Sequence, residues 1–370
     1  MKTNQRHIII SIRNDIDPSN IYSNGISQNI IFFCDLFKLL GHKVTLLVST
    51  QRKAKTISFG SNKKYSILTI DEIIQKKVRI DLLLEVGAII TYDIKQKIIR
   101  QGGKLLHVLL GNQLIMDMES ILYDSGESAG FRHLYKDMKN CWIIPQHIHQ
   151  KSYIEVLSDA VVDICPCIWE PDFVDHTVKS NLSFRVKPNI YVMEANISVV
   201  KNSLIPVTII EALFRKNPDS FDKAFIVNGI KMSEHNYFLK NIVSNLHSCN
   251  ASLIKDKVFF SPRSKFSSIF KHYDVLLSHH WKNPLNYLSF EALYFNIPFV
   301  HNSELMQEVG YYYPEFDVHL GALALEDALL NFKNNFNQHV TSNKAYLDTV
   351  SIHNTDVQKK YKELLEQALN

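Results

Sequence analysis

Three stretches of the sequence place polar or charged residues where a strand is expected to run into a helix. The stretch from Asp274 to Glu308 reads as a strand, a polar loop, a helix, a turn containing Pro298 and a further strand. Glu291 lies near the start of that helix. A carboxylate there can accept hydrogen bonds from two neighbouring hydroxyls of a ligand, and the preceding loop presents free backbone amides to an anion. The alternative is an ordinary solvated glutamate on a helix surface.

A second stretch carries positive charge close to a strand end. The expected strand 189–194 is followed by Lys201 and then by an expected helix, 204–215. Arg263 follows another expected strand, 258–260. Ligands of open α/β sheets bind at the carboxyl ends of the strands. A fixed cation there stabilises negative charge that develops on a departing group. Both side chains could equally be ordinary surface cations.

The third stretch is the loop 15–25, between the first expected strand and the first expected helix. Asn24 and Gly25 could bring backbone amides close to a ligand, because glycine lets the chain approach closely. A single glycine is not the three-glycine motif of dinucleotide-binding proteins. Asp15 in this loop is a candidate catalytic base.

Histidines add further acid–base candidates, because imidazole titrates near neutral pH. His107, on the fourth expected strand, is a candidate catalytic base, and His147 and His149 form a second group. The chain has 16 histidines, so a structural role is the simpler explanation for most of them.

Three histidines at strand ends could suggest a metal site: His279, His280 and His301. Adjacent residues of a strand point to opposite faces, so His279 and His280 should not share one ion. We therefore expect no metal. Instead, one of this pair is expected to face a ligand pocket, with Trp281 forming part of its wall.

The elements that must position these residues alternate along the chain. Apolar, β-branched runs alternate with stretches of helical periodicity, which is typical of doubly wound parallel sheets. The expected strands are 7–12, 44–48, 82–85, 104–109, 141–144, 161–165, 189–194, 223–227, 258–260, 274–278 and 297–301. The expected helices are 26–40, 92–101, 150–157, 204–215, 234–246, 265–273, 288–294 and 356–369.

The periodicity is interrupted between Cys165 and Pro188 by prolines and polar residues, as in an interdomain linker. The pattern predicts an N-terminal domain (1–168), a linker (169–188) and a C-terminal domain (189–350). A last helix (351–370) could return to the N-terminal domain.

The bulk composition is that of a packed globular protein. Of 370 residues, 46% are hydrophobic and 21% are charged, which excludes disorder as the main state. A net charge of +4 is too small for a dedicated nucleic-acid binder but suits an anionic ligand. Five cysteines without a CxxC pair indicate reduced thiols. No signal peptide or membrane-spanning run is visible. We therefore expect a soluble, cytoplasmic protein, with at most peripheral contact with the inner face of the membrane.

Residues 274–308 resemble the donor-binding segment of GT-B glycosyltransferases. That segment has a strand, a glycine- or asparagine-rich loop, a helix with Glu-Ala-Leu and a Gly-x-Pro turn. In many retaining members two glutamates stand eight positions apart. Here Glu291 matches the second glutamate, Asn283 holds the position of the first, Asn286 stands where glycine is common, and Asn296-Ile-Pro298 replaces the turn.

The stretch 191–213 is similar to the strand and basic loop of the same enzymes. Lys201 matches the lysine of the family, whereas the arginine usual a few positions earlier is absent and Asn196 lies near its place. Four segments (23–30, 279–287, 301–305 and 310–317) also resemble a bacterial GT-B-like family described as a domain of unknown function. That similarity covers nearly the whole chain but implies no substrate.

The resemblance implies two Rossmann-like doubly wound domains that face each other across a cleft. It implies a metal-independent glycosyltransferase that needs no cofactor and takes a nucleotide sugar as substrate. The acceptor would be a bacterial glycan or glycoconjugate of surface-polysaccharide biosynthesis, held on the side of Asn24 and Gly25. If the enzyme inverts the anomeric centre, His107 or Asp15 would be the base. The implied donor-binding residues are Lys201, Asn196, Arg263, His280, Asn283, Asn286, Tyr287, Glu291 and Ser303.

Three other functions fit parts of the sequence. A nucleotide-sugar epimerase would share the fold, but the sequence singles out no pair of catalytic carboxylates. A binding protein that has lost catalysis is compatible with asparagine at position 283. Glycosylation of modified DNA is disfavoured by the modest charge and the lack of a basic stripe.

Overall fold

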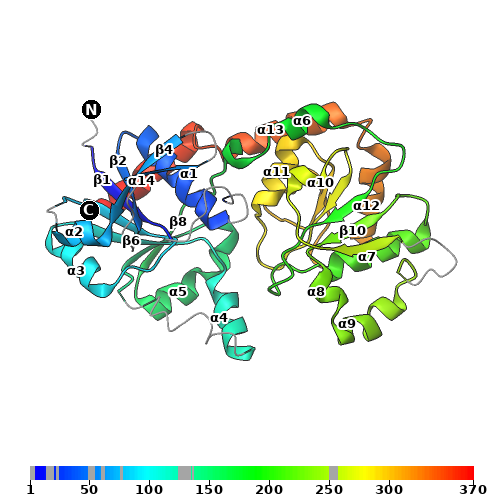
Figure 1. Ribbon diagram of the computed structural model, residues 1–370, viewed down its shortest axis with the longest axis horizontal. Helices are drawn as coiled ribbons and strands as arrows, with labels where there is room; N and C mark the ends of the chain where they lie inside the picture. The colour runs from blue at the N-terminus through cyan, green and yellow to red at the C-terminus, as the bar shows by residue number, and fades with distance from the viewer. Residues whose placement is uncertain are drawn as a thin grey trace. The chain divides into compact units, whose positions relative to one another are not determined.

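The computed structural model describes residues 5–13, 21, 25–48, 55–59, 63–75, 78–123, 135, 137–249 and 257–370. The chain forms two compact units (Figure 1). Unit 1 comprises Met1–Phe173 and Asp348–Asn370, and unit 2 comprises Val174–Leu347. The last 23 residues therefore belong to the same unit as the N-terminus.

Unit 1 contains a sheet of eight strands in the order β3-β4-β2-β1-β5-β6-β7-β8. These strands are β1 (His7–Ser11), β2 (Lys43–Val48), β3 (Thr56–Phe59), β4 (Lys63–Thr69), β5 (Leu82–Glu85), β6 (Lys104–Leu109), β7 (Asn140–Ile143) and β8 (Val161–Ile164). All neighbours are parallel except β3 and β4. The strand order reverses between β1 and β5, so this is a doubly wound sheet with its switch point there.

Helices accompany this sheet, and the last one comes from the far end of the chain. They are α1 (Gly25–Leu39), α2 (Ile70–Gln75), α3 (Tyr92–Arg100), α4 (Gln113–Leu122), α5 (Lys151–Ser158) and α14 (Thr355–Leu369). The buried Tyr361 of α14 makes edge contacts with the rings of Phe33, Phe37 and Trp142. Its hydroxyl donates to the carbonyl of Pro166 at 2.6 Å. In Figure 1 the red α14 accordingly lies among the blue and cyan elements of unit 1.

Unit 2 contains a sheet of six parallel strands in the order β11-β10-β9-β12-β13-β14. They are β9 (Ile190–Val192), β10 (Ala224–Val227), β11 (Val258–Ser261), β12 (Val275–Leu277), β13 (Phe299–His301) and β14 (Tyr311–Tyr312). The order reverses between β9 and β12. The chain leaves these two neighbouring strands in opposite directions, and open α/β sheets bind ligands at the carboxyl ends of such strands.

The helices of unit 2 are α6 (Thr177–Asn181), α7 (Leu204–Lys216), α8 (Ile230–Ser233), α9 (Asn236–Asn241), α10 (Phe266–Ile269), α11 (Tyr287–Phe295), α12 (Val318–Asn331) and α13 (Phe336–Thr349). The buried residues Val207, Ile210 and Leu213 of α7 share one core with β9, β10 and β12. Leu325 and Ala328 of α12 belong to the same core. The two longest sheet-covering helices therefore fix the strands whose ends form the site.

The main departure from the sequence prediction is the expected helix 234–246. The structure has the short α9 there, followed by one 3₁₀ turn, Val243–Asn245. Asn241, Ser244 and Asn245 each direct a side chain to the carbonyl four residues earlier. Such side-chain bonds compete with the helix backbone and favour short segments. Similarly, the helix expected at 265–273 is only the four-residue α10.

Both sheets are doubly wound and flanked by helices, so the predicted α/β class with two Rossmann-like halves is confirmed. Within the described ranges, no helix is both long enough and apolar enough to cross a bilayer.

Candidate functional site

The carboxyl edge of the unit 2 sheet gathers polar side chains from three loops. Glu194 and Lys201 follow β9, His279 and His280 follow β12, and Asn302 follows β13. Strands β9 and β12 flank the switch point, where open sheets bind ligands. This edge is therefore the candidate site.

Glu194 joins the two loops that diverge at the switch point. It is 1% exposed, and its Oε1 accepts hydrogen bonds from Ser278 Oγ at 2.5 Å and from the His279 amide at 3.1 Å. Burial raises the pKa of Glu194, although these two bonds and the charge of Lys201 act in the opposite direction. Glu194 was not predicted from the sequence, because its partners follow β12, which only the folded sheet brings next to β9.

The loop that carries Lys201 is shaped by Asn196. Asn196 has φ +53°, its side-chain oxygen accepts from the Ser203 amide at 2.8 Å, and its side-chain nitrogen donates to the Asn228 carbonyl at 3.2 Å. Its amide also donates to the Lys201 carbonyl at 3.1 Å. The side chain of Asn196, an expected donor ligand, thus stabilises the fold of this loop.

Lys201 itself is half-buried. Burial lowers the pKa of its ammonium, and the negative charge of Glu194 partly offsets that effect. The two residues lie beyond ion-pair distance of each other, since no contact within 4.0 Å joins them. Lys201 is therefore a desolvated cation with no ion pair among the described residues, held where an anion would compensate its charge.

His279 lies on the inner side of the site. Its Nδ1 and the hydroxyl of Tyr313 are 3.0 Å apart, and that hydroxyl donates to the Ser278 carbonyl at 3.1 Å. The proton of the imidazole therefore sits on Nδ1. Burial lowers the pKa of His279 to about 4, so the ring is neutral at pH 7. Its buried Nε2 has no hydrogen-bond partner among the described residues.

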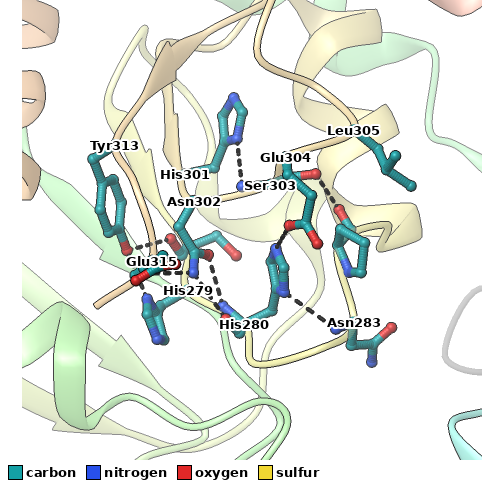
Figure 2. Close-up of polar contacts among 12 residues, drawn as sticks. His279, His280, Asn283, His301, Asn302, Ser303, Glu304, Leu305, Tyr313 and Glu315 are labelled. Atoms are coloured by element: carbon teal, nitrogen blue, oxygen red, sulfur yellow. Dashed lines mark hydrogen bonds and ion pairs between the residues drawn. The ribbon is translucent and has the colours of Figure 1, made fainter. Parts of the chain in front are cut away.

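His280 is held by Asn302, which bonds both backbone groups of the histidine (Figure 2). The side-chain oxygen of Asn302 accepts from the His280 amide at 2.9 Å, and its nitrogen donates to the His280 carbonyl at 2.8 Å. The same nitrogen donates to the Glu315 carbonyl at 2.9 Å. Asn302 thus clamps the loops after β12, β13 and β14 to one another.

Ser303 and His301 complete this clamp. Ser303 is 2% exposed and donates its hydroxyl to the Pro284 carbonyl at 2.5 Å. His301 accepts from the Ser303 amide at 3.1 Å and bonds the Val309 carbonyl through Nε2 at 2.8 Å. Ser303, also an expected donor ligand, uses its hydroxyl to pin the loop ahead of α11.

Glu291 lies on α11, and its carboxylate has no hydrogen-bond or ion-pair partner within the described residues. The residue is half-buried. Burial alone raises its pKa to about 8. By contrast, Asn286 caps α11, with its side-chain oxygen 3.5 Å from the Leu288 amide. A desolvated acid without a partner is the kind of group that a ligand completes.

The remaining expected donor residues lie around this edge. Tyr287 opens α11, with its ring 6.1 Å from that of Phe290. Asn283 donates its amide to His280 Nδ1 at 3.2 Å. Arg263 is exposed and follows β11, two strands away from β9. Their roles as ligands stay predictions.

The N-terminal candidates lie in unit 1. His107, on β6, is buried, and its Nε2 lies 3.0 Å from Glu85, which also pairs with Lys95 at 2.6 Å. This buried cluster gives His107 a structural partner, and its role as a base stays a prediction. Gly25 is the first residue of α1. Asp15 and Asn24 lie outside the described residues.

Comparison with known proteins identifies the family. The family described as "Protein of unknown function (DUF2827)" matches residues 8–365. The chain belongs to this family. No curated protein matches it in sequence.

Solved glycosyltransferase structures share the fold of this family member over almost its whole length. Trehalose-6-phosphate synthase from Burkholderia multivorans is 11% identical, with 99% of this chain and 98% of that chain covered and a TM-score of 0.58. Sucrose-phosphate synthase from Thermosynechococcus elongatus is 13% identical (98% and 99% covered, TM-score 0.53). HepE from Anabaena, solved with UDP-glucose, is 10% identical (98% and 99% covered, TM-score 0.56). The predicted GT-B fold is therefore confirmed.

The unpartnered carboxyl predicts an unusual effect on stability. The pKa of Glu291 is about 8 in the folded chain and about 4.5 when exposed, so ionisation above pH 4.5 opposes folding, fully so above pH 8. Glu291→Gln should therefore raise the melting temperature of the ligand-free protein at about pH 9, and the gain should shrink towards about pH 5. Thermal unfolding at both pH values measures this. The exposed Glu308→Gln is the control, and an equal effect of both variants at pH 9 would contradict the assignment.

Proposed function

We propose that this protein is a glycosyltransferase that moves a sugar from a nucleotide-sugar donor to a glycan or glycoconjugate acceptor in the cytoplasm, without a metal ion. The observation that carries the proposal is the carboxyl of Glu291 on α11, which is desolvated and has no partner within the described residues. The GT-B fold adds support, because the solved structures compared above are glycosyltransferases.

Glu291 fits the ribose of the nucleotide. A vicinal diol has two O–H donors, and a carboxylate can accept both at once. Hydrogen bonds to the charged form of an acid favour that form, so the diol would reverse the effect of burial on the Glu291 pKa. A phosphate could not act in this way, because it does not offer a pair of O–H donors.

Lys201 fits the diphosphate. Among the described residues, the charge of Glu194 acts on the half-buried ammonium, and a diphosphate would supply a second negative charge. During transfer, the bond between the anomeric carbon and the diphosphate oxygen breaks, and its electron pair stays on that oxygen. The acceptor hydroxyl bonds to the anomeric carbon and gives its proton to a base. A preorganised cation stabilises the charge on the leaving group and makes a metal unnecessary.

The nucleotide is most simply uridine diphosphate, since HepE was solved with UDP-glucose. A second candidate function is a binding protein of the same fold without transferase activity. The observation that favours it is Asn283, whose uncharged side chain stands where many related enzymes have a glutamate.

The donor site can be tested with a panel of UDP-, GDP-, CMP- and TDP-sugars. At least one should raise the melting temperature of the wild type, because a ligand of the folded state stabilises it. Glu291→Gln should weaken the binding of that nucleotide sugar by more than about tenfold, the loss expected when a charged hydrogen bond is removed. Glu308→Gln should not weaken it. If no nucleotide binds, the proposed function is wrong. Binding without turnover on any acceptor would favour the binding protein.

Lys201 should act on the leaving group more than on the bound donor. Lys201→Gln is expected to lower kcat, for transfer or for donor hydrolysis, by about 100-fold, while the Kd of the nucleotide sugar changes by less than about tenfold. Steady-state kinetics and calorimetry measure the two quantities. The exposed Lys231→Gln, in the same unit, serves as the control. Equal losses in kcat and Kd would assign Lys201 to ground-state binding only.

A further inference from the structure

Glu304 and His280 follow two neighbouring strands and face each other, but no hydrogen bond joins them. His280 follows β12 and Glu304 follows β13, and these strands are adjacent. Figure 2 shows the imidazole of His280 directed at the carboxylate of Glu304, with Asn283 on its other side. His280 Nε2 and Glu304 Oε2 lie 3.7 Å apart.

The hydrogen bond from Asn283 fixes the proton of the imidazole. The Asn283 amide donates to His280 Nδ1 at 3.2 Å, so Nδ1 carries a lone pair and the proton lies on Nε2. Burial lowers the pKa of His280 to about 3, and the ring is therefore neutral at pH 7. The contact with Glu304 is consequently not an ion pair, and 3.7 Å is too long for a hydrogen bond.

The pair thus contains a buried donor that points at an acceptor without reaching it. Nε2 of His280 has no hydrogen-bond partner among the described residues, and the imidazole is 11% exposed. The carboxylate of Glu304, in contrast, is 50% exposed. Buried donors without partners are rare in folded proteins, and a ligand or a water molecule can complete such a donor. Since Glu304 is exposed, its side chain can withdraw to admit one.

A hydroxyl group has the chemistry that this gap requires. It accepts one hydrogen bond and donates another, so it can accept a hydrogen bond from His280 Nε2 and donate one to Glu304. Two bonds of about 2.8 Å at a tetrahedral angle span about 4.6 Å, so Glu304 would withdraw by only about 1 Å. The carboxylate of Glu304 would repel a phosphate, and an ammonium group cannot accept a hydrogen bond from Nε2.

We propose that His280 and Glu304 together bind one hydroxyl of the donor sugar, and that Glu304 determines which sugars are accepted. The inference rests on the proposed function, since it assumes a nucleotide sugar at this edge. Asn283 is uncharged, so the loop after β12 has no carboxylate at that position. Glu304, which follows the neighbouring strand β13, carries one. The hydrogen bonds of Asn302 and Ser303 fix the backbone directly before Glu304 and so position Glu304 beside His280.

The experiment compares a nucleotide with its sugar conjugate. Isothermal titration of UDP and UDP-glucose, or of the corresponding pair that binds in the donor panel, gives two dissociation constants for each variant. Glu304→Ala should leave the affinity for UDP within about twofold and lower the ratio Kd(UDP)/Kd(UDP-glucose) by about tenfold or more, as expected for loss of a charged hydrogen bond. Glu308→Ala, an exposed glutamate of the same loop, is the matched control.

Each outcome separates this inference from the proposed function. Nucleotide binding with an unchanged ratio in Glu304→Ala would overturn the sugar-hydroxyl site and leave the proposed function standing. An equal loss of affinity for UDP and UDP-glucose would also overturn it, because Glu304 would then act on the nucleotide or on folding. If no nucleotide binds to the wild type, both proposals are wrong.

Discussion

The site in unit 2 depends on one constraint: two loops that leave neighbouring parallel strands in opposite directions must be held at a fixed spacing. Glu194 meets this constraint by accepting hydrogen bonds from Ser278 and the His279 amide across the switch point. A backbone hydrogen bond of 3.0 Å from the Trp281 amide to the Val200 carbonyl joins the same two loops further out. Without this connection, the cation after β9 and the histidines after β12 would have no defined separation.

Most polar groups at this edge are satisfied within the chain, and that makes the exceptions informative. Asn196, Ser303 and Asn302 shape loops, and burial keeps the imidazoles of the site uncharged. Within the part of the chain that the structure describes, the carboxyl of Glu291 has no partner and Lys201 interacts only with the distant charge of Glu194. Nε2 of His280 lies 3.7 Å from Glu304, too far for a hydrogen bond. A binding site is expected to leave unsatisfied the groups that the ligand completes.

The periodicity of apolar residues was sufficient to predict the alternating strands and helices, because buried parallel strands and amphipathic helices have distinct repeats. It failed at 234–246, where side-chain bonds to the backbone interrupt a helical pattern. Glu291 and Lys201 could be proposed as site residues because they follow strand ends. Glu194 and Glu304 could not, since their partners lie on strands that only the folded sheet brings together. The side chains of Asn196 and Ser303 shape loops, since residue types that bind ligands also favour loops, and their roles as ligands stay predictions.

The number of protons released during nucleotide binding tests the assignment of Glu291 to the ribose most directly. At pH 7 an acid with a pKa of about 8 is mostly protonated, and two ribose hydroxyls that donate to Glu291 would drive it to ionise. Titration calorimetry in buffers of different ionisation enthalpy should therefore show release of about one proton per nucleotide bound by the wild type. Glu291→Gln should release almost none. Tight binding to the wild type without proton release, or the same release from both proteins, would contradict the assignment of Glu291 to the ribose.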